Sequence, residues 1–372
     1  MDVITKRKID AVVAGYLCVD MTPEFEKRKG VSYSALLRPG KLIETKGLHF
    51  SLGGAVANTG LALRKFGQNT VLMGCVGKDN LGDMAVSELA KAGAKGGIRR
   101  TGSAGTAYSI VIAPPGMDRI FFEYPGCNKI FTSAHIDYNL VKKSRLLHFG
   151  YPPLMESLWK KDGAELQKLL KKARSTGAVV SLDMALPDPA APAGKANWRK
   201  ILAGSLPFVD IFVPSIEELI FMLEPAFYSR ITKKAKSSDI LDHISEKDYA
   251  RVAEKIIALG VKIVLIKGGH KGAYLKTGDL KGLSSSPLRL SDKAGCPEGT
   301  WLKTLPLEKS RVCNACGAGD CSIAGFLTAL LKGKTVVQAG QFAMMAGRDN
   351  LYGKDALSGL VAWPKMEKLI KE

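Results

Sequence analysis

Residues 312–320 read Val-Cys-Asn-Ala-Cys-Gly-Ala-Gly-Asp, and no other stretch of the chain is as informative. They lead directly into an apolar run, residues 321–331, which is typical of a buried helix and is followed by Gly333. Small residues at a helix start let backbone N–H groups approach an anion closely. A carboxylate there, Asp320, repels phosphate but can take a proton from a hydroxyl that attacks it. A glycine-rich turn before a core helix is the alternative interpretation.

A second glycine-rich helix start lies far upstream, where residues 53–60 read Gly-Gly-Ala-Val-Ala-Asn-Thr-Gly. Gly53 and Gly54 leave room for a ligand against the backbone. Asn58, one turn into the helix, offers both a hydrogen-bond donor and an acceptor. This combination suits the hydroxyl groups of a ligand better than a phosphate.

The two motifs together resemble those of the ribokinase-like, or phosphofructokinase-B, family of carbohydrate kinases. That family has an N-terminal Gly-Gly…Asn motif for the sugar and a C-terminal Asp-Thr-x-Gly-Ala-Gly-Asp motif for phosphoryl transfer. The resemblance extends from about residue 10 to about residue 360, in the expected order. It implies an α/β fold, a three-layer sandwich with a mostly parallel central sheet, helices on both faces and a small β lid. Residues 1–372 would form a single kinase domain.

Shorter matches lie between these motifs. Residues 12–15 followed by Asp20 resemble the first strand and its substrate-binding carboxylate, and residues 77–82 resemble the family's Gly-x-Asp-x-x-Gly turn. Residues 215–218, Ser-Ile-Glu-Glu, stand where the family usually has Asn-x-x-Glu. Residues 265–272 resemble the strand and turn that meet the nucleotide.

The resemblance implies an ATP-dependent transfer of the γ-phosphoryl group to a hydroxyl of a sugar or sugar-like alcohol. Asp320 would be the general base, with backbone N–H groups of residues 315–319 holding the charge on the phosphoryl group. The residues expected in this anion hole are Gly317, Ala318 and Gly319, and those expected to bind the sugar are Asp20, Gly53, Gly54 and Asn58.

The nucleotide side is implied by a second set of positions. Lys267 and Gly269 would lie near the phosphates or the ribose, and Ser215 and Glu218 near Mg²⁺, which Glu218 would orient through water. A helix expected over residues 335–351 would line the adenine with Met344 and Gly347, although a methionine in a helix usually packs in the core.

Two positions depart from the family motifs. Asn314-Ala315 replaces Asp-Thr, and a neutral asparagine is a poorer ligand for a monovalent cation, so a K⁺ requirement stays open. Ser215 replaces the usual asparagine and has a shorter reach toward the Mg²⁺–phosphate group. Neither change affects Asp320, and activity is therefore expected.

Strand-like and helical stretches alternate along the chain, which indicates a parallel sheet whose ligands bind at the carboxyl ends of the strands. Expected strands cover residues 10–15, 70–76, 145–150, 178–183, 210–213 and 262–266, and expected helices cover 81–92, 155–175, 215–223 and 247–259. Residues 32–50 and 106–126, the latter with a hairpin turning at 114–118, would form the lid, which excludes water or serves as a homodimer clasp. Residues 224–245 and 282–303 look inserted relative to the family and are expected at the surface.

Bulk composition limits the cellular setting. A hydrophobic content of 46% is enough for a large core, and no run of 18 apolar residues suggests a membrane span. The first eight residues lack the apolar stretch of a signal peptide, so a cytoplasmic location is expected. Seven cysteines favour reduced thiols over a disulfide framework, with metal or redox use of Cys313 and Cys316 as the alternative.

The net charge of +19 raises the question of nucleic-acid binding. The basic residues are spread widely, and no arginine-rich run with interleaved aromatics stands out. A solvated basic surface, or a positive field that attracts an anionic nucleotide, is the preferred interpretation, and no nucleic-acid partner is expected.

The sequence leaves several alternatives for the molecule that accepts the phosphoryl group. A nucleoside kinase of the same family would need an aromatic platform, for which Tyr108, Phe122, Tyr124 and Tyr151 are candidates. A phosphorylated sugar would need a basic side chain near the lid, such as Arg119. A catalytically weak sugar or nucleotide sensor is a further alternative, but a sensor has no need of Asp320 beside an anion hole.

Overall fold

A computed structural model describes residues 7–26, 32–94, 96–115, 117, 119–236, 238–290, 295–313 and 315–371 of the chain. The strands are β1 Ile9–Gly15, β2 Cys18–Glu24, β3 Gly47–Gly53, β4 Thr70–Gly77, β5 Ile98–Thr101, β6 Tyr108–Ile112, β7 Ile120–Tyr124, β8 Ser144–Gly150, β9 Val179–Leu182, β10 Ile211–Phe212, β11 Ile263–Lys267, β12 Ala273–Thr277 and β13 Thr300–Leu302. The α-helices are α1 Tyr33–Leu36, α2 Gly54–Lys65, α3 Asn80–Lys91, α4 Tyr138–Lys142, α5 Glu156–Ser175, α6 Trp198–Ser205, α7 Ile216–Leu223, α8 Pro225–Ala235, α9 Glu246–Ala258, α10 Lys281–Ser284, α11 Ala318–Leu331, α12 Val336–Asn350 and α13 Trp363–Lys371.

The main sheet has the strand order β13-β12-β11-β10-β9-β8-β1-β4-β5. Its strands from β11 to β5 are parallel, whereas β12 and β13 are antiparallel to their neighbours. Successive residues of β1 point to opposite faces, and both faces are apolar, as expected of a strand buried on two sides.

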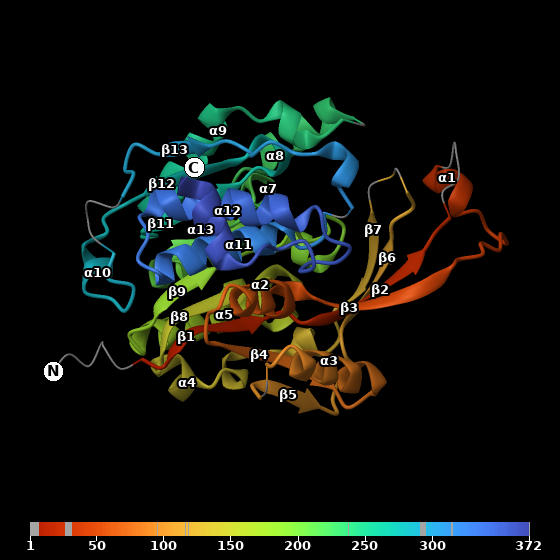
Figure 1. Cartoon of the computed structure of the whole chain (residues 1–372), viewed down its shortest axis with the longest axis horizontal. Helices are drawn as coiled ribbons and strands as arrows, with labels where there is room; N and C mark the ends of the chain where they lie inside the picture. The colour runs from red at the N-terminus through yellow and green to blue at the C-terminus, as the bar shows by residue number, and fades with distance from the viewer. Residues whose placement is uncertain are drawn as a thin grey trace.

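Helices cover both faces of this sheet (Figure 1). Ala11 and Val13 of β1 pack in a core with α2, α11 and α12, while Val12 and Ala14 pack in a second core with α5, α6 and α9. The structure is therefore the expected three-layer α/β sandwich, and the carboxyl ends of its parallel strands meet at one edge.

A small sheet with the order β3-β2-β6-β7 projects from that edge (Figure 1). We call it the small sheet below. The expected hairpin is confirmed, because β6 and β7 pair antiparallel from Tyr108 opposite Tyr124 to Ile112 opposite Ile120. Its turn includes residues 116 and 118, which lie outside the described residues. Residues 32–50 contribute α1 and most of β3, but β2 is a strand that the sequence did not lead us to expect.

The expected central strands are confirmed as β1, β4, β8, β9, β10 and β11, and three departures are informative. The helix expected over 155–175 is not continuous, because the backbone of residues 160–163 is not helical. Three of these four residues have positive φ. Residues 224–245 contain α8, and residues 282–303 contain part of α10 and all of β13.

Candidate functional site

Asp320 lies in the first turn of α11, where Gly317 adopts a left-handed backbone with φ of 74°. The carboxylate is 4% exposed and accepts hydrogen bonds on both oxygens. Thr59 Oγ1 donates to Oδ1 at 3.0 Å, and Asn58 Nδ2 donates to Oδ2 at 3.1 Å. The Tyr151 hydroxyl lies 2.8 Å from Oδ1 and 2.7 Å from Oδ2. Three elements, α2, α11 and the end of β8, thus converge on one carboxylate.

The N-terminus of α11 carries the expected anion-hole residues. No side chain among the described residues caps this end of the helix. The Ala318 N–H has a long contact of 3.4 Å to the Ala315 carbonyl, and the Cys321 N–H donates to the Gly317 carbonyl at 2.8 Å. Helix N-termini carry a partial positive charge and attract anions. The carboxylate of Asp320 and an anion-attracting helix end therefore share one place.

Lys267, the last residue of β11, lies beneath this helix turn. Its Nζ is 2.8 Å from Oδ1 of Asp183, which directly follows β9. A Cβ added at Gly319 would lie 3.8 Å from the same Nζ, so the ammonium is adjacent to the first turn of α11. Burial disfavours the ammonium, but Asp183 and Glu218 outweigh it, and the pKa of Lys267 is raised. Lys267 is therefore a cation held beside the N-terminal turn of α11.

Asp183 was not expected from the sequence, and it is a buried carboxylate in this pair. Burial raises its pKa, Lys267 opposes the rise, and Glu218 and Asp320 add to it. The Lys267 ammonium and the Asp183 carboxylate are 2.8 Å apart, which is the distance of an ion pair.

Ser215 and Glu218 form a capping box at the start of α7. The Glu218 N–H donates to Ser215 Oγ at 3.3 Å, and the Ser215 N–H donates to Glu218 Oε2 at 2.7 Å. Ser215 also forms an isolated bridge to Lys267, which brings both residues next to the ion pair. One oxygen of the Glu218 carboxylate is thus used within its own helix, as in other capping boxes.

Asp20 faces the helix start at Gly53 and Gly54. A Cβ added at Gly53 would lie 2.4 Å from Asp20 Oδ2, and one at Gly54 would lie 2.5 Å from the Tyr16 carbonyl. Gly54 also has φ of 81°, which favours glycine. Burial raises the pKa of Asp20, Cys18 and Ser109 oppose this through hydrogen bonds, and Asp320 adds to the rise. Asp20 and Asp320 are therefore close enough to influence each other.

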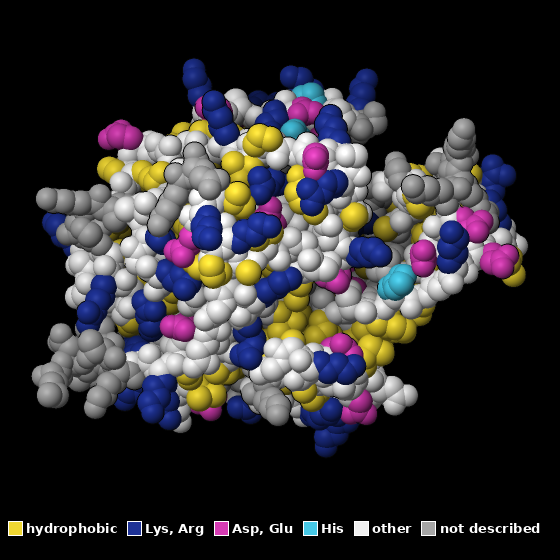
Figure 2. All heavy atoms as spheres, in the orientation of Figure 1, with side chains coloured by type: hydrophobic (Ala, Val, Ile, Leu, Met, Phe, Trp, Pro, Cys, Tyr) yellow, Lys and Arg dark blue, Asp and Glu magenta, His cyan; other side chains and the backbone are white. Residues whose placement is uncertain are grey.

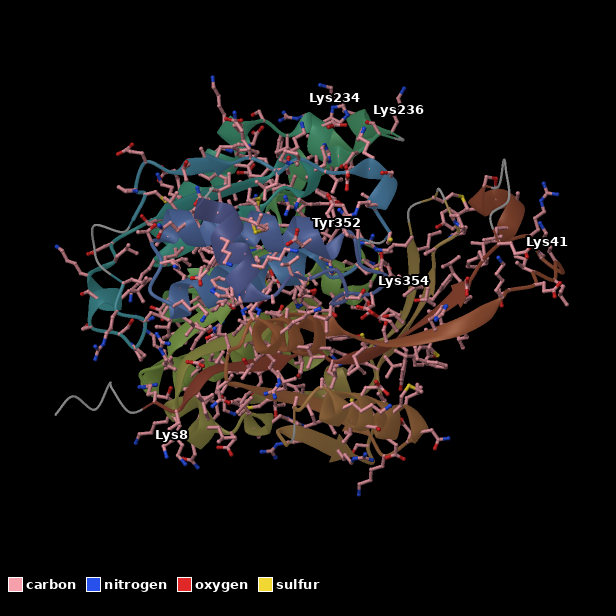
Figure 3. The ribbon with its side chains drawn as sticks, in the orientation of Figure 1. Lys8, Lys41, Lys234, Lys236, Tyr352 and Lys354 are labelled. Carbon is pink, nitrogen blue, oxygen red and sulfur yellow. The ribbon has the colours of Figure 1, made fainter. Side chains whose placement is uncertain are left out.

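The polar face of the small sheet continues outward from Asp20. Ser51 and Ser109 are its cross-strand neighbours, and Glu123 is opposite Ser109. Beyond them this face borders a cleft of about 640 Å³. The cleft is lined by Thr22, Pro23, Glu24, Phe25, Glu26, Lys46, His49, Val111, Ala113, Pro115, Arg119, Cys313, Cys316 and Lys354. Figure 3 shows Lys354 on the body side, where it faces the small sheet. This volume is in the range of small-molecule sites.

The other expected nucleotide residues lie on α12 and in the turn after β11. Gly347 of α12 packs against α11, since a Cβ there would meet Ser322 Oγ at 2.3 Å, and Met344 is partly buried against the same core. Gly269 begins a short turn after β11 with φ of 52°. Contact with a nucleotide stays a prediction for all three. Asn314, on which the K⁺ question depends, lies outside the described residues.

Sequence reasoning missed three residues of the cluster, namely Thr59, Tyr151 and Asp183. Tyr151 entered only as a candidate aromatic platform. Tyr151 and Asp183 both come directly after a strand of the parallel sheet, and that position was the available signal. Thr59 stands inside the motif that was recognised, next to Asn58.

A buried histidine–serine contact joins the neighbouring strands β8 and β9. His148 Nδ1 is 2.9 Å from Ser181 Oγ, and both side chains are fully buried. Burial, with a smaller effect from Lys267, lowers the pKa of His148 to about 3. His148 is therefore neutral in the folded protein.

The remaining expectations concern metals, membranes and charge. Within the described ranges, no disulfide joins the cysteines, no group of three or more His, Cys, Asp or Glu side chains is placed to hold a metal ion, and no helix is long and apolar enough to cross a membrane. Basic side chains are dispersed over the visible face in Figure 2, and the lysines Lys8, Lys41 and Lys234 lie at separate edges of the molecule in Figure 3.

Comparisons with known proteins identify the family and the fold of the chain. The model of the pfkB family of carbohydrate kinases matches residues 10–348. An uncharacterised sugar kinase of Archaeoglobus fulgidus is 25% identical over 283 residues, which cover 76% of this chain and 90% of the relative. The structure of Arabidopsis thaliana ribokinase with ribose and ATP superposes with a TM-score of 0.71 at 20% identity, covering 98% of this chain and 99% of that one.

An Escherichia coli structure, described as a ribokinase II in complex with ATP and Mg²⁺, has a TM-score of 0.69 at 20% identity and covers 98% of this chain and 99% of its own. At these identities the solved structures show a shared fold, and the family model shows the membership. The chain belongs to the pfkB family of carbohydrate kinases.

Proposed function

We propose that this carbohydrate kinase transfers the γ-phosphoryl group of ATP to a hydroxyl of a sugar or sugar-like alcohol, with Asp320 as the general base. One observation carries the proposal: a buried carboxylate, held by three donors, shares the uncapped N-terminus of α11 with the Lys267 ammonium. A base must reach the attacking hydroxyl while a positive environment holds the transferred charge.

The acceptor binds between the small sheet and α2 in this proposal. Asp20 accepts hydrogen bonds from its hydroxyl groups, and Asn58 can both donate hydrogen bonds to them and accept from them. Gly53 and Gly54 let the acceptor approach the backbone. The reacting hydroxyl then lies next to Asp320, which removes its proton as the new O–P bond forms and the bond to the β,γ-bridging oxygen of ATP breaks. Precise placement of the two reactants contributes several kcal/mol, on the order of 7 or more, to such reactions.

The phosphoryl charge is held by backbone N–H groups of Gly317, Ala318 and Gly319 and by Lys267. One donor of this kind is worth roughly 3 kcal/mol. Mg²⁺ would be held mainly by the phosphates and by water, and carboxylate oxygens at Glu218 and Asp183 offer the hard ligands that it prefers. When bound, the ion would neutralise phosphate charge, and Glu218 would orient it through water. We keep Gly269, Ser215, Met344 and Gly347 as proposed nucleotide contacts.

We propose that the small sheet acts as a lid on this site and that the whole chain works as one domain. The polar face of the small sheet looks onto the cleft, while its other face carries side chains that are apolar and exposed. Leu48 and Phe50 are each 48% exposed, and Phe122 is 52% exposed. Figure 2 shows hydrophobic side chains where the small sheet joins the body. Such a face favours a homodimer formed through the lid.

Three of the four aromatic residues considered as a platform for a nucleoside base point away from the Asp20 face. Tyr108 and Tyr124 lie 5.3 Å apart between ring centroids, and with Phe122 they alternate with Ser109 and Glu123, so that they point away from the Asp20 face. Tyr151 is engaged by Asp320. The residues considered for a base platform are thus directed elsewhere.

The test is release of ADP from Mg-ATP with a panel of pentoses, hexoses, sugar phosphates, inositols and nucleosides. A rate that depends on a sugar or sugar-like alcohol supports the proposal and names the acceptor class. Stimulation by nucleosides alone would establish the nucleoside kinase instead. ATP binding with no stimulation by any acceptor would favour the sensor.

A further inference from the structure

Tyr151 is held in an unusual conformation at the carboxyl end of β8. Its φ of 66° and ψ of 40° are left-handed, and Pro152 and Pro153 follow directly. A bulky residue at positive φ persists only where the surrounding structure fixes it, and proline restricts the residue before it. The ring lies 6.4 Å from that of Tyr16, whose N–H donates to the carbonyl of Gly150 at 3.2 Å. The backbone therefore fixes the position of the Tyr151 side chain.

The hydroxyl of Tyr151 contacts the carboxylate of Asp320. A carboxylate offers about four lone-pair sites. The Tyr151 hydroxyl lies within 2.8 Å of both oxygens, Thr59 occupies Oδ1, and Asn58 occupies Oδ2. The plane of the carboxylate is consequently determined from several sides before any substrate arrives.

The three donors differ in how easily an acceptor could replace them. Thr59 is fully buried, and Tyr151 is fixed by its backbone. Asn58 is only partly buried and belongs to the proposed sugar site. An incoming hydroxyl that donates to Asp320 can therefore take the place of the Asn58 amide while the other two donors remain.

We propose that Tyr151 is a positioning residue of the phosphoryl transfer, which together with Thr59 holds the carboxylate of Asp320 oriented toward the acceptor hydroxyl. The inference rests on the proposed role of Asp320 as the base. The loss of the Tyr151 hydroxyl removes a donor that contacts both oxygens of Asp320 and lets the carboxylate rotate, which lowers the rate of proton transfer from the acceptor hydroxyl.

Other charged groups surround this contact. Asp20 on β2, Asp183 after β9 and Lys267 on β11 interact electrostatically with Asp320, and Glu218 on α7 interacts with Tyr151. All of them remain in a Tyr151→Phe variant, which keeps the ring and removes one oxygen atom. A change in the turnover of this variant is thus attributable to the hydroxyl.

The experiment measures kcat and the KM values for the best acceptor and for ATP in the wild-type chain and in Tyr151→Phe. The expected result is a kcat about tenfold lower with unchanged KM values, because the oriented carboxylate acts in the transfer step. Tyr138→Phe is the matched control, because its hydroxyl contacts Ser133 Oγ at 2.7 Å and the Leu169 carbonyl. Thr59→Val should lower kcat in the same way, and Thr59→Ser, which keeps the hydroxyl, should retain the wild-type kcat.

A double variant separates this inference from the proposed function. If Tyr151 acts only through Asp320, Tyr151→Phe causes no further loss in an Asp320→Asn background. A wild-type kcat in Tyr151→Phe, or an equal further loss of kcat in the Asp320→Asn background, overturns the role of Tyr151 while Asp320 stays the base. Near-normal turnover in Asp320→Asn instead overturns the proposed function itself.

Discussion

Breaking the ion pair between Asp183 and Lys267 should destabilise the protein strongly. The side chains are 2% and 15% exposed and 2.8 Å apart, so water screens them little. Asp183→Asn leaves the Lys267 ammonium buried with Glu218 as its nearest remaining counter-charge. Removing one partner of a buried pair costs about 3–5 kcal/mol, and we expect the lower end because Glu218 remains. Since a typical domain has only about 5–15 kcal/mol of stability, the loss is easily measured.

The assay is urea-induced unfolding of a double-mutant cycle. Asp183→Asn and Lys267→Met should each lower the free energy of unfolding by about 3 kcal/mol, while the double variant should lose much less than the sum, because no buried charge is left alone. Glu88→Gln is the control: its pair with Lys91 is 2.6 Å long, but the side chains are 46% and 69% exposed, and the change should be below about 1 kcal/mol. Additive losses at Asp183 and Lys267 would refute the description of a coupled buried pair.

Three further results are expected. Asn58→Ala should raise the KM for the acceptor more than the KM for ATP in steady-state kinetics, and the reverse would mean that the two sites are exchanged. His148 is neutral when folded, with a pKa of about 3, and protonates near its ordinary value of 6.5 when unfolded, so its contribution is complete above pH 6.5 and is lost as the pH falls toward 3. Urea unfolding should therefore show a loss at pH 5 that is about 2 kcal/mol smaller in His148→Gln than in the partly exposed control His243→Gln, and equal losses would contradict the burial argument. Replacing Phe50 and Phe122 with serine should shift a lid-mediated dimer to monomer in sedimentation velocity, whereas a wild-type chain that is already monomeric would exclude the lid dimer.

Much of the fold could be predicted because its signals are local. The strands of the parallel sheet are short apolar runs, and residues 317–320 indicate the start of α11. The strand β2 was not predicted, because Asp20, Pro23 and Glu24 interrupt its apolar pattern. It is stabilised by pairing with β3 and β6 rather than by its own composition. The break in α5 at residues 160–163 has no proline to mark it.

The site was predictable only in part because its key contacts join distant segments. Asn58 and Asp320 are 262 positions apart, yet each stands in a motif whose glycines indicate a ligand. The pairing of Lys267 with Asp183 spans 84 positions, and no local pattern specifies it. Tyr151 depends on a left-handed backbone before two prolines, a conformation that propensity alone does not favour for tyrosine.

The most direct test of the central claim compares the wild-type chain with Asp320→Asn in acceptor-dependent release of ADP from Mg-ATP, with ATP binding measured by calorimetry on the same samples. Asp279→Asn, an exposed aspartate whose carboxylate accepts from the Lys281 N–H at 2.9 Å, is the control. If Asp320 is the base, its variant loses roughly 100-fold or more in turnover while binding ATP normally, and the control is unaffected. Turnover of Asp320→Asn close to the wild-type rate would show that the proton of the acceptor leaves by another route.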